Sequence, residues 1–170
     1  MRIAIACDHI AFEAKEKLKA WLEARGYEVL DCGCHSKERT HYPLYGRAAG
    51  LAVASGKAEM GIVMCGTGVG ISNAANKVAG VRCVLCHDGL MAQRARKIYN
   101  ANMLAMGSRI IGEGVREEIA ERFLKTEFDD SMNNQLRQEL LDLMGSQDAA
   151  PGEELFADLL AKWQAGEYHD

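Results

Sequence analysis

A cysteine opens a glycine-rich segment that lies between an apolar run and a stretch compatible with a helix. The segment reads Cys65-Gly66-Thr67-Gly68-Val69-Gly70, and the apolar residues 61–64 precede it. A strand, a glycine turn and a helix start, in this order, present backbone N–H groups to an anion. The positive end of a helix stabilises a thiolate. We therefore predict that Cys65, with the Thr67 hydroxyl nearby, transfers a proton while the loop holds a developing oxyanion.

The spacing of these glycines does not match the common nucleotide-binding motifs. Gly66, Gly68 and Gly70 alternate after the third apolar run, whereas the dinucleotide fingerprint is G-x-G-x-x-G after the first strand. Gly66 also lies too far from Lys77 for a P-loop. A flavodoxin-like nucleotide binder is therefore a distant alternative to an enzyme.

Other polar segments follow apolar runs elsewhere in the chain. Asp8-His9 either caps a helix or binds the hydroxyls and ring oxygen of a sugar, and the sequence leaves both roles open. His87-Asp88 favours a helix cap. Cys32-Gly33-Cys34-His35 has no second Cys/His pair at zinc-finger spacing. We interpret it as a strand end and a turn, and we predict no metal site.

Apolar runs alternate with helical patterns five times. Strands are predicted at residues 2–7, 27–31, 61–65, 81–86 and 103–107, and helices at 12–25, 42–55, 69–77, 90–98 and 115–125. This alternation predicts an α/β fold, a Rossmann-like three-layer sandwich with a five-stranded parallel sheet. Ligands bind beyond the carboxyl ends of the strands in such sheets. The polar residues after these runs, including Ser108 and Arg109, are therefore expected at one edge.

Residues 1–145 are predicted to form this domain, followed by a linker and a C-terminal helix within 146–170. The predicted helix has an apolar stripe made of Leu155, Phe156, Leu159, Leu160 and Trp163. Such a helical tail packs either on its own domain or on a partner subunit, and the sequence favours neither.

The 170 residues are 48% hydrophobic and carry a net charge of -4 at pH 7. The acidic balance argues against nucleic acid and anionic membranes as partners. No apolar run approaches the ~20 residues of a membrane span. The six cysteines follow no disulfide framework, so we expect reduced thiols in a cytoplasmic protein.

Five segments carry a specific combination of motifs: residues 2–9, 36–43, 65–71, 74–82 and 107–109. Together they resemble the family of type B ribose-5-phosphate isomerases and galactose-6-phosphate isomerases over roughly residues 2–125. The resemblance implies a Rossmann-like fold, dimers or tetramers, and neither metal nor organic cofactor. It also implies an aldose–ketose isomerisation of a sugar phosphate through a cis-enediol.

By this resemblance Cys65 moves the proton between C1 and C2 of the sugar, and Thr67 assists. The amides of the glycine loop hold the enediolate oxygen, which agrees with the need for fixed donors where charge develops. The resemblance assigns substrate binding to a further set of residues: Asp8, His9, Tyr42, Gly66, Gly68, Gly70, Asn100, Arg109 and Arg137.

The chain departs from the ribose enzymes at two places. Ile98 stands where they carry the histidine that opens the sugar ring, and their later phosphate clamp of arginines is missing. Arg137 matches the clamp only if one residue is inserted. In galactose-6-phosphate isomerases, the A-type subunit resembles the chain that supplies the missing histidine and arginines. The B-type subunit resembles the chain that supplies the cysteine, and this chain is similar to it in Cys65 and in the C-terminal tail. The resemblance implies either an A-type partner or a homo-oligomer with a rewired site.

We therefore expect a galactose-6-phosphate isomerase of the B type, converting galactose 6-phosphate to tagatose 6-phosphate. A ribose-5-phosphate isomerase, or a related pentose or tetrose phosphate isomerase, is the alternative within the class. A non-catalytic sugar-phosphate-binding subunit is the alternative from another class. Ile98 favours that alternative, whereas Cys65 with Thr67 argues against it.

Overall fold

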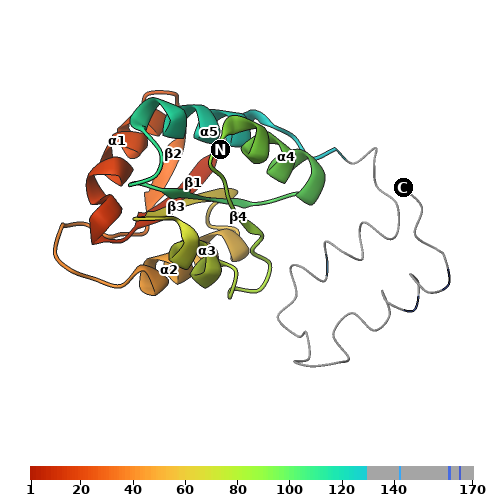
Figure 1. The fold of residues 1–170 in the computed structure, drawn as a ribbon, viewed down its shortest axis with the longest axis horizontal. Helices are drawn as coiled ribbons and strands as arrows, with labels where there is room; N and C mark the ends of the chain where they lie inside the picture. The colour runs from red at the N-terminus through yellow and green to blue at the C-terminus, as the bar shows by residue number, and fades with distance from the viewer. Residues whose placement is uncertain (130–141, 143–160, 162–164, 166–170) are drawn as a thin grey trace.

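The computed structural model describes residues 1–129 together with residues 142, 161 and 165. Within them, five parallel strands form one sheet in the order β2-β1-β3-β5-β4, with helices on both faces (Figure 1). The strands are β1 (Arg2–Cys7), β2 (Glu28–Asp31), β3 (Met60–Cys65), β4 (Cys83–Leu85) and β5 (Met103–Gly107). The helices are α1 (Phe12–Glu23), α2 (Tyr42–Ala54), α3 (Val69–Ala75), α4 (Gly89–Tyr99) and α5 (Glu113–Lys125), and a short 3-10 helix, η1 (His9–Ala11), precedes α1.

This architecture confirms the predicted Rossmann-like α/β sandwich with a five-stranded parallel sheet. The first and last strands have the predicted bounds, and the other elements differ at their ends. The first helix is shorter than predicted because a turn closes it, with the Gly26 N–H donating to the Glu23 carbonyl and Gly26 at φ 83. The predicted C-terminal helix and its apolar stripe lie outside the described residues.

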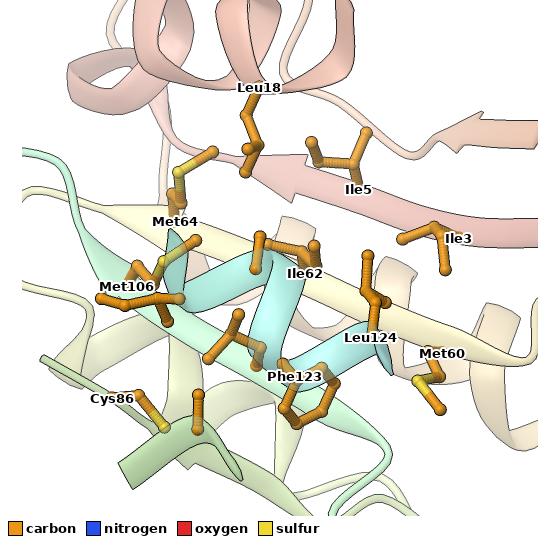
Figure 2. Close-up of a cluster of buried hydrophobic side chains, with 14 of the residues drawn as sticks. Ile3, Ile5, Leu18, Met60, Ile62, Met64, Cys86, Met106, Phe123 and Leu124 are labelled. Atoms are coloured by element: carbon orange, nitrogen blue, oxygen red, sulfur yellow. The ribbon is translucent and has the colours of Figure 1, made fainter. Parts of the chain in front are cut away.

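The sheet separates two apolar layers. One layer joins the sheet to α1, α4 and α5, and Figure 2 shows Ile5 and Ile62 of the sheet with Leu18 of α1 and Phe123 of α5. The other layer joins the sheet to α2 and α3, and Cys65 belongs to it. Because β-strand side chains alternate between faces, Cys65 at the end of β3 faces α2 and α3.

Helix α2 approaches its neighbours closely because small residues face them, as its composition predicts. A Cβ atom on Gly46 would lie 2.7 Å from the carbonyl oxygen of Ile71 in α3. A Cβ on Gly50 would lie 3.0 Å from a methyl of Val78. These contacts hold α2 directly against α3, and therefore place the start of α2 beside the start of α3.

A buried lysine fixes the loop that follows β2. The Lys15 side chain is fully buried, and its Nζ donates to both carboxylate oxygens of Asp31 and to the Cys34 carbonyl oxygen, each at 2.8 Å. Burial alone would raise the pKa of Asp31, but the hydrogen bonds from Lys15 and from the Gly33 N–H hold it below its ordinary value. The loop is thereby tied to β1 and α1 where it leads toward Tyr42.

The segment 32–35 is an irregular loop after β2, in agreement with its predicted turn. The sulfur atoms of Cys7 and Cys34 lie 3.7 Å apart as free thiols. Among residues 1–129, no three side chains of the metal-binding types gather at one point. In the same part of the chain, no helix combines the length and apolar character that crossing a bilayer requires.

Candidate active site

The glycine loop joins the end of β3 to the start of α3. Cys65 is the last residue of β3 and is 4% exposed. The Gly68 N–H donates to its Sγ at 3.1 Å, and the Val69 N–H donates to the Thr67 hydroxyl oxygen at 3.3 Å. One loop amide thus points at the sulfur where negative charge would develop.

Two other amides of the loop have no protein acceptor. Among the hydrogen bonds of the described residues, the N–H groups of Gly66 and Thr67 donate to no protein atom. Thr67 is exposed and Gly66 is partly exposed, so this part of the loop lies at the surface of the chain. Backbone N–H groups fixed where negative charge develops are the usual means of holding an oxyanion.

Glycine is required at two positions of the loop for different reasons. Gly68 has φ 84, and a Cβ there would lie 2.5 Å from Leu85 Cδ1 and 2.8 Å from the Met106 carbonyl carbon. A Cβ on Gly70 would lie 2.7 Å from the ring of Tyr42. Gly68 therefore lets the loop lie against β5, and Gly70 lets the Tyr42 ring lie against the loop.

Asp8 and His9 lie beside this loop because β1 and β3 are neighbours. The Asp8 N–H donates to the Met64 carbonyl at 3.2 Å. Asp8 Oδ1 accepts hydrogen bonds from the Ile10 and Ala11 N–H groups, so the predicted capping role is present at η1. His9 Nδ1 lies 3.1 Å from the Thr40 carbonyl oxygen and 3.3 Å from the Thr40 nitrogen. Asp8 Oδ2 and His9 Nε2 form no hydrogen bond among the described residues.

The end of β5 is joined to the same loop. The Ser108 N–H donates to the Cys65 carbonyl at 2.9 Å, and the Arg109 N–H donates to the Gly66 carbonyl at 3.0 Å. The Arg109 side chain passes Gly66, where a Cβ would lie 3.8 Å from Arg109 Cδ. The structure therefore brings together, at one edge of the sheet, most of the candidate site residues: Asp8, His9, Tyr42, Cys65, Gly66, Thr67, Gly68, Gly70 and Arg109.

Asn100 is not part of this group in a single chain. It caps the C-terminal end of α4 at φ 47, and its carbonyl accepts a hydrogen bond from Arg82 Nε at 2.8 Å. Asn102, two residues on, bonds to Arg82 just before β4. Asn100 therefore lies at the amino edge of the sheet, opposite Cys65. Arg137 lies outside the described residues. Asp88 caps α4 by accepting from the Met91 N–H at 2.8 Å, the role that the sequence favours.

The sequence analysis missed a basic hollow next to Arg109. It has a volume of about 230 Å³ and lies between η1, α1, the end of β5 and the start of α5. Its lining consists of Ile10, Glu13, Ala14, Lys17, Ser108, Arg109 and Arg116. Arg116 had a signal in the sequence, because its position falls on the same stripe of α5 as the buried residues 119, 120 and 123. A charged residue on an apolar stripe indicates a buried polar site.

Comparisons with known proteins agree on one family. The model of the family described as Ribose/Galactose Isomerase matches residues 3–141. The galactose-6-phosphate isomerase subunit LacB of Clostridium acetobutylicum is 41% identical over 170 residues, covering 99% of this chain and 98% of that protein. The ribose-5-phosphate isomerase B of Escherichia coli is 44% identical over 134 residues, covering 79% of this chain and 90% of that protein. The solved structure of ribose-5-phosphate isomerase B from Clostridium thermocellum has a TM-score of 0.80 at 39% identity, covering 85% of this chain and 95% of that one.

Proposed function

Because the chain belongs to the ribose/galactose isomerase family and is a sugar-phosphate aldose–ketose isomerase, we propose that it is a galactose-6-phosphate isomerase subunit of the B type. The observation that carries this choice is that the sequence likeness to the galactose relative, at 41% identity, extends over nearly the whole chain. The galactose relative aligns with 99% of the chain, whereas the E. coli ribose relative aligns with 79%. At 99% coverage, the alignment with the galactose relative includes the C-terminal tail, which the sequence also relates to the galactose enzymes.

The proposed reaction moves one proton between adjacent carbons. Cys65, as the thiolate, takes the proton from C2 of the open-chain aldose, and the C1 carbonyl oxygen becomes the enediolate oxygen. The free N–H groups of Gly66 and Thr67 stabilise this oxygen. The Thr67 hydroxyl assists proton movement between the two sugar oxygens. Cys65 then returns its proton to C1, which gives the ketose and regenerates the thiolate.

We further propose that the complete site includes a second subunit, in a homo-oligomer or with an A-type isomerase subunit. Ile98 supplies no group for ring opening, and Asn100 lies at the amino edge of the sheet, opposite the Cys65 of its own chain. Asn100 contacts a substrate only if it meets the Cys65 edge of a neighbouring subunit. The free thiols are consistent with the cytoplasm as the location, and no cofactor enters the proposed reaction.

A ribose-5-phosphate isomerase is the second candidate. The observation that favours it is the E. coli relative, whose identity of 44% over 134 residues is slightly higher than that of the galactose relative. Tetrose phosphates belong to the same alternative, because the proton transfer at C1 and C2 does not depend on chain length.

A panel of C4 to C6 sugar phosphates tests the choice of substrate. The purified chain is assayed alone and together with an A-type galactose-6-phosphate isomerase subunit. We expect kcat/KM for galactose 6-phosphate to exceed that for ribose 5-phosphate by about tenfold or more, a difference that one sugar carbon and its hydroxyl readily produce. We also expect the A-type subunit to raise the rate. Faster turnover of ribose 5-phosphate by the chain alone would instead identify the ribose enzyme.

A further inference from the structure

Two buried cysteines face each other where β1 ends beside the loop that follows β2. The Sγ atoms of Cys7 and Cys34 lie 3.7 Å apart, although 27 positions separate the two residues in the sequence. Both are free thiols, and Cys7 is fully buried while Cys34 is 3% exposed. Because a disulfide holds its sulfur atoms about 2.05 Å apart, a closure of about 1.7 Å would join this pair.

The backbone on both sides keeps the two thiols together. The Cys7 N–H donates to the Gly33 carbonyl at 2.7 Å, and the Cys34 N–H donates to the Cys7 carbonyl at 3.0 Å. Lys15 Nζ donates to the Cys34 carbonyl at 2.8 Å and ties this part of the loop to α1. Two groups fixed in this way react with each other at a high effective concentration. A bond between the two sulfurs is therefore favoured over a bond to a separate thiol.

The pair is a site of its own, separate from the cysteine of the glycine loop. Cys7 and Cys34 both belong to the apolar layer between the sheet and α1, α4 and α5. Cys65 belongs to the layer on the other face of the sheet. Neither Cys7 nor Cys34 has a task in the proposed proton transfer, so their thiols are available for other chemistry.

The two thiols differ in their access to solvent. Residues 35–39, which follow Cys34 directly, are exposed, so a small displacement of this segment uncovers the Cys34 sulfur. Burial raises the pKa of the Cys7 thiol. Cys7 therefore stays protonated and reacts slowly with an oxidant from solvent. An oxidant meets Cys34 first, and Cys7 completes the bond.

We propose that Cys7 and Cys34 form a site of oxidation by peroxides, and that the disulfide formed there lowers the activity of the enzyme. With hydrogen peroxide, the Cys34 sulfur attacks one oxygen, the O–O bond breaks, and a sulfenic acid and water form. The Cys7 sulfur then attacks the sulfenic sulfur, the S–S bond forms, and the hydroxyl group leaves as water with the Cys7 proton. The two thiols lose two electrons, which reduce one peroxide to two water molecules. A dithiol reductant reverses the reaction by exchange and is itself oxidised.

The main chain connects this site to residues that the family resemblance assigns to sugar binding. Cys7 immediately precedes Asp8 and His9, and the loop after Cys34 contacts the His9 ring through the Thr40 backbone. Closing the gap between the sulfurs moves at least one of these segments. A misplacement of about 1 Å can lower a rate by ~10²-fold. Since these side chains are expected to bind the sugar, KM should rise more than kcat falls, an expectation that rests on the proposed function.

Oxidation of the full-length chain with hydrogen peroxide, followed by blocking of the remaining thiols and peptide mass spectrometry, tests formation of the bond. We expect a disulfide-linked pair of peptides containing Cys7 and Cys34, which dithiothreitol separates. Cys34→Ser should abolish this pair and keep the fold, because a serine hydroxyl also donates to the Ser36 carbonyl, as the Cys34 thiol does at 3.2 Å. Cys32→Ser is the matched control. Cys32 lies in the same loop but packs in the opposite layer, so this variant should form the disulfide as the wild type does.

Steady-state kinetics before and after peroxide treatment test the effect on activity, with the preferred sugar phosphate as substrate. The wild type, Cys34→Ser and Cys32→Ser all keep Cys65, so direct oxidation of that thiol affects them equally. We expect the wild type and Cys32→Ser to lose about tenfold or more in kcat/KM and to recover it with dithiothreitol. Cys34→Ser should lose markedly less. Cys7→Ala gives the same comparison if Cys34→Ser does not fold.

Three results would overturn the proposal. The first is the absence of a disulfide between Cys7 and Cys34 in the oxidised wild type. The second is a disulfide that leaves kcat/KM unchanged. The third is an equal loss of activity in Cys34→Ser, which would assign the loss to another thiol. The mass-spectrometric measurement requires no isomerase activity, so a failure of the proposed function is distinguished from a failure of the oxidation site.

Discussion

Replacing Cys65 by alanine is expected to lower the isomerisation rate by about 10²–10⁴-fold, the usual contribution of a general base. The reason is that we propose Cys65 as the proton-transferring group of the loop, with the Gly68 N–H directed at its sulfur. The fold should survive, because one small side chain is removed at the end of a strand. The measurement is kcat on the preferred sugar phosphate, with a thermal melt to confirm folding.

Cys83→Ala is the matched control for this variant. Cys83 is also buried, but it lies in β4 at the edge of the sheet, two strands away from β3. Burial raises the pKa of the Cys83 thiol, so this cysteine stays protonated and takes no part in the reaction. Its replacement should change kcat by about twofold or less, which is small beside the loss expected when a general base is removed. A Cys65→Ala enzyme as active as Cys83→Ala would remove Cys65 from the mechanism.

Gly68→Ala should lower the free energy of unfolding by about 2–5 kcal/mol and abolish most activity. A side chain at φ 84 costs about 1–2 kcal/mol, and overpacking costs about 1–3 kcal/mol more. The overpacking arises because the new Cβ would meet Leu85 and the backbone of Met106. The loop must shift to relieve these contacts, which moves the Gly68 N–H away from the Cys65 sulfur. Urea denaturation measures the loss of stability.

Gly80→Ala separates the two costs. Gly80 has nearly the same backbone angle, φ 81, but a Cβ there meets no atom within 4 Å. This variant should lose only the ~1–2 kcal/mol of the left-handed conformation and keep its activity. Equal destabilisation by Gly68→Ala and Gly80→Ala would mean that the close approach to β5 does not fix the loop.

The sequence predicts the edge of the sheet at which the site lies, because this depends only on the order of the elements. Parallel strands joined by helices bring the ends of β1, β3 and β5 together. The glycine loop was also predicted from the sequence. The structure explains why glycines stand there, because a side chain at Gly68 or Gly70 would have no room. What the sequence could not decide is which polar atoms are already used. Asp8 caps η1 with one carboxylate oxygen, and His9 fixes the Thr40 backbone.

Two features could be recognised only from the three-dimensional structure. Asn100 follows α4, which runs antiparallel to the strands, so it reaches the opposite edge from Cys65. Its assignment came from resemblance, which does not say from which subunit a residue comes. Arg116 was treated as part of an amphipathic helix. Its place on the apolar stripe of α5 indicates a buried polar group, but the groups that surround it come from α1 and β5, which are distant in sequence.

Exchange of carbon-bound hydrogen with solvent tests proton transfer by Cys65 most directly. The isomerisation is run in D₂O for many turnovers, and deuterium at C1 and C2 of the sugar phosphate is measured by NMR. Proton transfer through an enediol predicts deuterium in product and recovered substrate for the wild-type chain. It also predicts about 10²–10⁴-fold slower incorporation for Cys65→Ala. Incorporation of deuterium by Cys65→Ala at the wild-type rate would contradict proton transfer at Cys65.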